Sequence, residues 1–302
     1  TATDVVAETL VNWGVRWVFG MVGHSNLGLA DALRRRTADG EMSYVAIRHE
    51  GAAAFACSAY GKLTGRPAAC LAIAGPGATN LLTGLWDAHV DNAPVIALTG
   101  QIQSQWLGRA AFQEVDLRSA FGGVARWSAS LLADTQYGEL TTQACKHALL
   151  QEGPVHLIFP DDVQTRPSNA AAGSPKGRLA SRRVAPDPDQ LRTVVAEIAA
   201  ARRPAIIVGH GARNDMAGIQ ALAERLRCPV ITPFKAKGQI GDDHPLAAGV
   251  LGRSGTPVAS WVMNESDLLV VFGSSFSNHT GISSKTRTLQ IDRDPMALVS
   301  RH

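Results

Sequence analysis

Short apolar runs alternate with segments of helical spacing along most of the chain. Runs such as AACLAIA at 68–74 and PVIALT at 94–99 are apolar at nearly every position, which is typical of strands buried on both faces. Between the runs, apolar residues recur three and four positions apart, as in amphipathic helices. The pattern predicts helices at 4–13, 27–37, 50–63, 79–89 and 137–150, and strands at 16–20, 43–47, 68–74, 94–99 and 155–159.

This alternation stops in the middle of the chain and then resumes. Residues 165–188 are rich in Pro, Gly, Ser, Ala and Arg without periodicity, which predicts a linker. Beyond it the pattern predicts helices at 189–201 and 215–227, and strands at 204–209, 228–232, 267–273 and 287–292. We therefore predict an α/β fold of two domains, each a mostly parallel sheet flanked by helices. The expected boundaries are 1–166 for the first domain, 167–187 for the linker and 188–302 for the second domain.

Composition narrows the class of protein. Hydrophobic residues make up 45% of the chain and charged residues 18%, which suits a folded core and excludes a disordered chain. The net charge is +3, and acidic and basic residues are mixed along the chain without a long basic block. We therefore expect no nucleic-acid partner. Residues 67–86 carry no charge, but Gly, Pro and Asn interrupt them, so we expect strand, loop and helix there and no membrane contact.

The cysteines indicate a reducing compartment. None of the four has the spacing of a metal or redox site, so we expect buried thiols, a cytoplasmic location and no metal ligands in this chain. The N-terminal residues show no signal pattern. The four are Cys57, Cys70, Cys145 and Cys228.

Polar loops follow successive predicted strands of the first domain. They read GMVGHSN at 20–26, RHE at 48–50, GPGATN at 75–80 and TGQIQSQWLGRAAFQE at 99–114. Ligands of open parallel sheets bind at the carboxyl ends of the strands. We therefore expect these loops to converge on one site.

Glu50 is the leading candidate for chemistry. It opens the apolar segment EGAAAFA, and Arg48 and His49 are its nearest cations in sequence. A first-turn acid that favours the helix dipole is one interpretation. The other is a carboxyl in apolar surroundings that shares a proton and serves as an acid–base group. His24, at a strand end, is as often a structural hydrogen-bond partner as a catalyst.

The motifs RHE, GxxTGxP, GPGATN, DxxPVIAxTGQ and FQE follow one another over residues 48–114. Their order resembles the pyrimidine-binding domain of thiamine diphosphate enzymes that decarboxylate 2-oxo acids, above all pyruvate oxidase and acetolactate synthase. The resemblance implies that Glu50 hydrogen-bonds N1′ of the aminopyrimidine and promotes its imino tautomer. That tautomer removes the thiazolium C2 proton, and the resulting ylide attacks the 2-oxo carbon.

The resemblance also implies roles for other residues of the first domain. Gln101 matches a cofactor-side residue, and Gly75, Pro76, Gly77 and Asn80 would line the pyrimidine pocket. The substrate-side residues would be Phe112, Gln113, His24 and Ser25. Several members of the family have another polar or an acidic residue where this chain has His24, so the identity of the substrate stays open.

The second domain resembles the family's central domain. Some members bind FAD or ADP there, with phosphates at helix N-termini, and many keep the domain without a nucleotide, so both interpretations stay open. The candidate nucleotide residues are Gly209, Gly211, Lys237, Gly273 and Asp292.

The family's diphosphate and Mg²⁺ site lies in a third domain, whose Gly-Asp-Gly signature has no counterpart here. We therefore expect the N-terminal portion of a longer enzyme, inactive alone, with truncation, proteolysis and a natural split all open. The complete enzyme would act on a 2-oxo acid such as pyruvate, with oxidation or carboligation of the acyl unit, as a homodimer or homotetramer. The alternative is a non-catalytic binding or regulatory subunit that keeps the fold.

Overall fold

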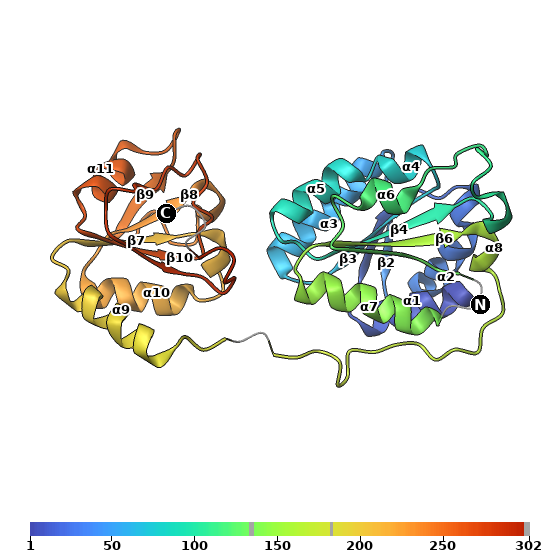
Figure 1. Ribbon diagram of the computed structural model, residues 1–302, viewed down its shortest axis with the longest axis horizontal. Helices are drawn as coiled ribbons and strands as arrows, with labels where there is room; N and C mark the ends of the chain where they lie inside the picture. The colour runs from blue at the N-terminus through green and yellow to red at the C-terminus, as the bar shows by residue number, and fades with distance from the viewer. Residues whose placement is uncertain (133–135, 182–183, 299–302) are drawn as a thin grey trace. The chain divides into compact units, whose positions relative to one another are not determined.

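A computed structural model describes residues 1–132, 136–181 and 184–298. The chain forms two compact units, which we call unit 1 (Thr1–Arg182) and unit 2 (Arg183–His302). Each unit is built on its own parallel sheet with helices beside it (Figure 1). This arrangement confirms the α/β class predicted from the alternating pattern.

The sheet of unit 1 has six strands in the order β2-β1-β3-β4-β6-β5, and all its pairs are parallel. The three strands β3, β4 and β6 are buried at every position, as their continuous apolar sequences predict. The strands are β1 (Trp17–Gly20), β2 (Ser43–Ala46), β3 (Ala68–Ala72), β4 (Val95–Gln101), β5 (Trp127–Ser130) and β6 (Pro154–Pro160).

Helices cover both faces of this sheet (Figure 1). One core contains Leu10 of α1, Leu33 of α2 and Ala144 of α7, and the core on the other face contains Ala53 of α3 and Leu85 of α5. The helices are α1 (Ala2–Asn12), α2 (Leu27–Ala38), α3 (Glu50–Thr64), α4 (Pro76–Thr79), α5 (Leu82–Val90), α6 (Leu117–Phe121), α7 (Tyr137–Leu150) and α8 (Asp161–Gln164), with 3₁₀ turns η1 (His24–Asn26) and η2 (Ser104–Trp106).

The structure differs from the predicted elements of unit 1 in two ways. The helix predicted at 79–89 is two helices, α4 and α5, because Pro76 starts α4 directly after Gly75. Strand β5 and helices α6 and α8 were not predicted at all. Every position of β5 is partly exposed, so its sequence WSAS has neither the apolar run of a central strand nor the alternation of a half-buried one.

The first part of the predicted linker lies against unit 1. The Gly173 N–H donates to Thr9 Oγ1 at 3.0 Å, and Asn12 Nδ2 donates to the Gly173 carbonyl at 3.0 Å. Arg178 pairs with Glu139 of α7 at 2.8 Å. Residues 165–181 form no helix or strand, which agrees with their composition, but hydrogen bonds to α1 hold them in place.

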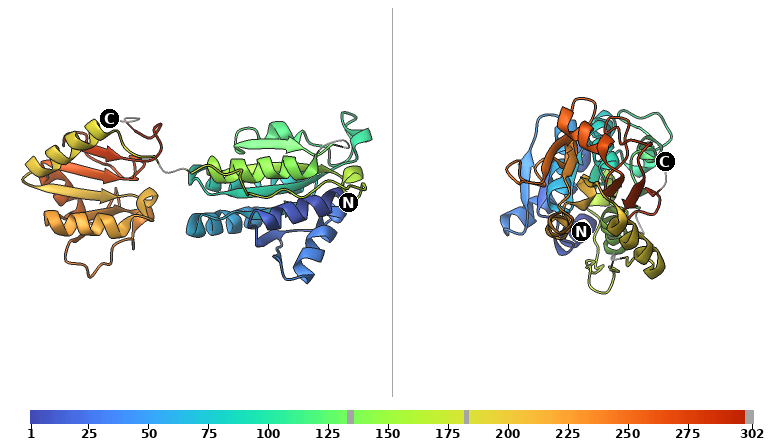
Figure 2. Two further views of the ribbon diagram at one scale, coloured as in Figure 1. Left: turned by 90° about the horizontal axis from the view of Figure 1, so that it is seen from below. Right: turned by 90° about the vertical axis from the view of Figure 1, so that its left-hand side faces the viewer.

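Unit 2 has a five-stranded parallel sheet in the order β11-β10-β7-β8-β9. Figure 2 shows this sheet in the yellow-to-red part of the chain. The strand order reverses between β7 and β10, so the loops that follow these two strands meet at a topological switch point. Strand β9 and helix α11 were not predicted. The elements are α9 (Pro188–Ala200), β7 (Pro204–Val208), η3 (His210–Ala212), α10 (Met216–Leu226), β8 (Val230–Pro233), η4 (Phe234–Ala236), β9 (Ala247–Leu251), α11 (Pro257–Glu265), β10 (Leu268–Phe272) and β11 (Thr288–Ile291).

Residues 182–183 of the predicted linker and 299–302 of the predicted second domain lie outside the described residues. Within the described residues, no helix is both long and apolar enough to cross a membrane.

All four cysteines are free and buried. Burial raises the pKa of the Cys145 thiol far above its usual range, and it raises the pKa of Cys228 to about 11. The pKa of Cys57 is also raised, first by burial and then by its hydrogen bond with Cys70. These thiols are therefore protonated and enclosed in the folded chain.

Candidate active site

Glu50 is the first residue of α3 and follows β2 after a short loop. The N-cap of this helix is His49, whose Nδ1 accepts a hydrogen bond from the Gly51 N–H at 3.1 Å. The Glu50 residue is only 7% exposed. Its carboxylate is thus enclosed at a helix N-terminus, where unpaired backbone amides favour negative charge.

Two residues of the loop after β3 contact this carboxylate. Asn80 Nδ2 donates a hydrogen bond to Glu50 Oε2 at 3.1 Å. Gly77 lies beside the other oxygen, since a Cβ built there would be 3.1 Å from Glu50 Oε1 and 2.5 Å from Ile73 Cγ1. The loops that follow β2 and β3 therefore meet around Glu50, and only glycine at position 77 leaves room beside Oε1.

Gly75 brings a third segment to the same loop. Its φ of 61° lies in the left-handed region, and a Cβ there would lie 2.6 Å from the Gln113 carbonyl oxygen. Gln113 also has a positive φ, of 64°. Its side-chain Oε1 is buried and has no hydrogen-bond partner among the described residues. A buried acceptor of this kind favours a ligand that brings an N–H or O–H donor.

Glu114 fixes the turn that carries Gln113. Its carboxylate accepts hydrogen bonds from the backbone N–H of Gly108 and, at 3.0 Å, of Ala111. These bonds, the one from Gly108 first, lower the pKa of Glu114. The neighbouring Phe112 is 85% exposed. The FQE motif includes Glu114, but the sequence does not indicate its role, because its backbone partners come together only in the folded turn.

The predicted residues His24 and Ser25 have different environments. His24 is exposed on η1, at the carboxyl end of β1. Ser25 is buried, and its Oγ accepts a hydrogen bond from the Ala74 N–H at 2.8 Å. The Ser25 carbonyl accepts from Gln164 Nε2 at 2.8 Å. Ser25 thus joins the loop after β1 to the loop after β3, and His24 is the accessible member of the pair. Gln164 had no sequence signal.

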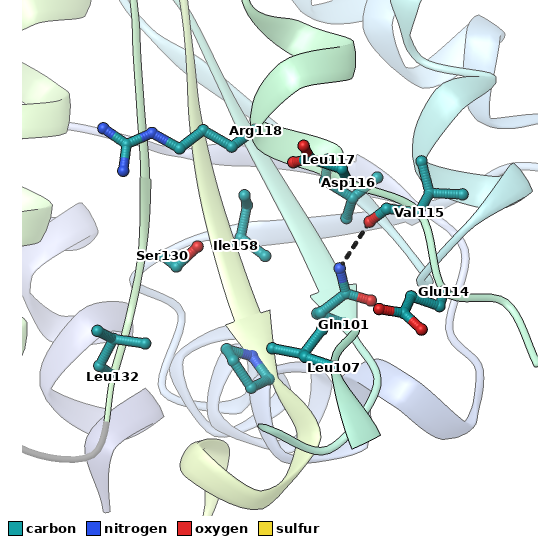
Figure 3. Close-up of a pocket in the computed structure, with 11 residues that line it drawn as sticks. Gln101, Leu107, Glu114, Val115, Asp116, Leu117, Arg118, Ser130, Leu132 and Ile158 are labelled. Atoms are coloured by element: carbon teal, nitrogen blue, oxygen red, sulfur yellow. Dashed lines mark hydrogen bonds between the residues drawn. The ribbon is translucent and has the colours of Figure 1, made fainter. Parts of the chain in front are cut away.

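Gln101, at the end of β4, forms hydrogen bonds to the backbone through both its amide nitrogen and its amide oxygen. Its Nε2 donates to the Val115 carbonyl at 2.9 Å (Figure 3). Its Oε1 accepts from the Ile102 N–H at 2.9 Å. The side chain thereby ties the strand end to the loop that carries Gln113. Its contribution to the site in this structure is to hold that loop.

Gln101 also lines a cavity of about 250 Å³ (Figure 3). The walls come from β4, β5, β6 and residues 107–118, whereas Glu50 is contacted by the loop after β3. The residues that line the cavity include Glu114, beside Gln113, but not Glu50, Gly77 or Asn80. Its lining residues are Gln101, Leu107, Glu114, Val115, Asp116, Leu117, Arg118, Ser130, Leu132, Ile158 and Pro160.

In unit 2, three predicted nucleotide residues lie together at the switch point. The Gly211 N–H donates to the Gly273 carbonyl at 3.0 Å, and the Gly209 N–H donates to the Phe272 carbonyl at 2.8 Å. These bonds join the loops after β7 and β10. The Gly211 amide, which a phosphate could otherwise bind, is occupied by this contact.

The other two predicted nucleotide residues follow different strands. Lys237 comes after β8 and η4, and its Nζ pairs with Asp242 at 2.8 Å. Asp292 follows β11, and its Oδ1 accepts from the Asp294 N–H at 3.0 Å. Both lie at carboxyl ends of strands but not at the switch point itself. Among the described residues of both units, no group of three His, Cys, Asp or Glu side chains could hold a metal ion.

The fold and the site define a class of protein. It is a two-unit α/β protein whose first sheet presents one enclosed carboxylate beside a glycine-shaped loop. At the switch point of the second sheet, backbone hydrogen bonds join the two loops. Two family models match this chain. Residues 1–120 match the thiamine pyrophosphate enzyme N-terminal TPP binding domain, and residues 191–302 match the central domain of the same enzymes. The chain belongs to the thiamine pyrophosphate enzyme family.

Curated relatives agree with this assignment. YdaP of Bacillus subtilis (strain 168), provisionally described as a thiamine pyrophosphate-containing protein, is 34% identical over 307 residues, which cover 100% of this chain and 52% of YdaP. The acetolactate synthase isozyme 1 large subunit of Escherichia coli (strain K12) is 32% identical over 281 residues, covering 92% of this chain and 49% of that protein.

A third relative is closer in length. An uncharacterized 42.6 kDa protein of Pseudomonas amyloderamosa is 32% identical over 302 residues, covering 99% of this chain and 75% of that protein. The chain spans about half the length of the first two relatives.

Proposed function

We propose that this chain forms the pyrimidine-binding and central parts of a thiamine diphosphate-dependent enzyme that decarboxylates a 2-oxo acid such as pyruvate. The acyl unit would then be oxidised or joined to an acceptor. The observation that carries the proposal is the enclosed carboxylate of Glu50, with Oε1 beside Gly77. The acetolactate synthase relatives support this group of enzymes.

The residues around Glu50 fit the aminopyrimidine of the cofactor. Gly77 leaves a space that a Cβ would fill, and Gln113 supplies a buried acceptor without a donor. When bound, thiamine diphosphate supplies a carbon nucleophile that holds the electrons released by decarboxylation. The protein's own part is to share a proton between Glu50 Oε1 and a ring nitrogen, and to accept an N–H at Gln113 Oε1. The low exposure of Glu50 keeps water from competing for that proton.

We propose that the diphosphate and its Mg²⁺ bind to a part of the enzyme other than these two units. Acid–base groups that transfer a proton in the transition state contribute ~10²–10⁴-fold. Glu50→Gln in the complete enzyme should therefore slow deuterium exchange at the thiazolium C2 by a factor in that range, with little loss of cofactor binding. The matched control is Glu139→Gln, which changes the first-turn acid of α7. Wild-type exchange in the Glu50→Gln enzyme would remove Glu50 from the mechanism.

A two-fold homodimer, alone or within a homotetramer, is the proposed assembly. Helices α3 and α5 expose large apolar side chains on unit 1: Leu63 is 84% exposed and Trp86 51%, and Phe55 and Val90 are also exposed. Ala52 and Ala59 on the same face of α3 are small and exposed, which suits close helix contact. A second copy of the chain would bury this face.

The proposed nucleotide is FAD or ADP, bound at the switch point of unit 2. The support is positional, because Gly209, Gly211 and Gly273 gather where ligands of open parallel sheets bind. A phosphate at Lys237 would have to displace Asp242 from the ammonium group. Adenine nucleotide binding is measurable on the complete enzyme by absorbance and titration calorimetry.

A further inference from the structure

The two oxygens of the Glu50 carboxylate have different neighbours. Oε2 accepts the hydrogen bond from Asn80 Nδ2 at 3.1 Å, while Oε1 faces the space beside Gly77. An amide nitrogen can only donate, so this contact fixes Oε2 as an acceptor. The oxygen left to share a proton with a ligand is Oε1.

Nothing intrinsic to a glutamate side chain fixes which oxygen points where. The terminal torsion of Glu is broad and roughly two-fold, so the carboxylate plane can turn at little cost. A charge-assisted hydrogen bond from a fixed amide removes that freedom. Asn80 is the side chain whose hydrogen bond to this carboxylate the structure shows.

The backbone holds Asn80 close to the start of α3. A Cβ at Gly51 would lie 3.2 Å from the Asn80 carbonyl oxygen, and a Cβ at Gly84 would lie 2.9 Å from the Gly51 carbonyl oxygen. Helices α3 and α5 thus meet backbone to backbone at these glycines. The Asn80 N–H donates to the Pro76 carbonyl at 3.0 Å, which fixes its main chain at the end of α4.

We propose that Asn80 is a positioning residue for Glu50: by occupying Oε2 it keeps the carboxylate plane in the orientation that presents Oε1 to the aminopyrimidine. This role rests on the proposed function. It differs from the role that the sequence resemblance implies, in which Asn80 lines the pyrimidine pocket itself. The two roles separate experimentally, because a residue that acts through Glu50 has no effect once Glu50 cannot share a proton.

The first test is a double-mutant cycle on deuterium exchange at thiazolium C2 in the complete enzyme, with thiamine diphosphate as the probe. The variants are Asn80→Ala, Glu50→Gln and the double variant, and the control Asn264→Ala changes an exposed Asn of α11. One charge-assisted hydrogen bond corresponds to roughly tenfold or more, so Asn80→Ala should slow exchange by about that factor. The double variant should exchange as slowly as Glu50→Gln alone.

Independent, multiplicative effects of the two changes would overturn the positioning role and favour direct contact between Asn80 and the cofactor. An Asn80→Ala enzyme with wild-type exchange would overturn it too, while Glu50→Gln could still be slow and the proposed function intact. If Glu50→Gln itself exchanges at the wild-type rate, the proposed function fails. The outcomes are therefore distinguishable.

The second test needs neither cofactor nor turnover. In the present chain labelled with ¹⁵N-asparagine, the side-chain amide signal of Asn80 is identified by its loss in Asn80→Ala. Glu50→Ala should shift this signal and speed its hydrogen exchange with water, whereas Asn264→Ala should leave it unchanged. An Asn80 amide unaffected by Glu50→Ala would show that the hydrogen bond is absent and would overturn the inference. The dispersion of the other amide signals reports whether each variant folds.

Discussion

We predict that the buried His156 makes unit 1 less stable in mild acid. This residue of β6 is fully buried, with Nε2 2.8 Å from Thr99 Oγ1 and Nδ1 3.1 Å from Ser128 Oγ, and its ring stacks on Phe121 at a centroid distance of 3.7 Å. A neutral ring, with one donor and one acceptor, suits two hydroxyl partners. Burial lowers the pKa of His156 from 6.5 to about 3.

The direction of the pH effect follows from this lowered pKa. Below pH 6.5 the unfolded chain binds a proton at His156, and the folded chain does not until the pH approaches 3. The unfolded state therefore binds more protons in this window, and the stability of unit 1 falls as the pH falls from 6.5 to about 3. At ~1.4 kcal/mol for each pKa unit, the loss is ~2 kcal/mol by pH 5 and ~5 kcal/mol over the whole window.

The measurement is urea unfolding at several pH values between 7 and 5, where carboxylates remain ionised. Unit 2 contains one tryptophan, Trp261, so a Trp261→Phe background makes the fluorescence report unit 1 alone. The change of interest is His156→Gln, which cannot titrate but can still bond both hydroxyls. The exposed His24→Gln, in the same unit, is its matched control.

We expect the free energy of unfolding to fall by ~2 kcal/mol from pH 7 to pH 5 in the background chain and in His24→Gln. The His156→Gln chain should start less stable at pH 7 and lose much less on acidification. Parallel pH dependences for His156→Gln and the background chain would refute the assignment of acid sensitivity to this ring.

Three further predictions address the assembly, the loop and the nucleotide. Trp86→Glu places a charge in the exposed apolar face of α3 and α5, so light scattering should show a shift from dimer to monomer. A wild-type chain that is monomeric at high concentration would contradict the proposed dimer. Gly75→Ala should lower the midpoint of thermal unfolding, because a left-handed φ costs a non-glycine residue ~1–2 kcal/mol and the added Cβ meets the Gln113 carbonyl. An unchanged midpoint would contradict that contact. If FAD binds, the complete enzyme should be yellow and Gly273→Leu should bleach it, whereas a colourless enzyme that ignores added FAD and ADP would contradict the nucleotide proposal.

The buried strands and the start of α3 could be predicted from the sequence for a physical reason. A central parallel strand is apolar on both faces, so β4 and β6 appear as continuous apolar runs. Strand β5 could not be predicted this way, because its sequence WSAS has neither an apolar run nor a regular alternation of apolar and polar residues. In unit 2 the unpredicted β9 has a glycine in its middle, Gly249 with a φ of 88°, and glycine is depleted in strands.

The candidate site was predictable in its location and less so in its contacts. Glu50 could be placed at the carboxyl edge because a strand and a helix flank it in sequence. The hydrogen bonds of Ser25 Oγ with Ala74 and of Gln101 Nε2 with Val115 could not be predicted, because the partners are backbone groups 49 and 14 residues away in the chain. Such contacts depend on how loops from different strands meet, and local periodicity carries no information about that.

The burial of the four thiols limits how fast oxidants can modify the cysteines of this protein. Because the thiols of Cys57, Cys145 and Cys228 are buried and protonated, peroxides and alkylating agents reach them only in molecules that have opened. The rate of damage is then the product of the fraction of open molecules and the reactivity of the exposed thiol. Cys228 lies in unit 2 and the other three cysteines lie in unit 1. The position of the first modified cysteine therefore records which unit opened first, and a ligand that stabilises one unit lengthens the chemical lifetime of the cysteines in that unit.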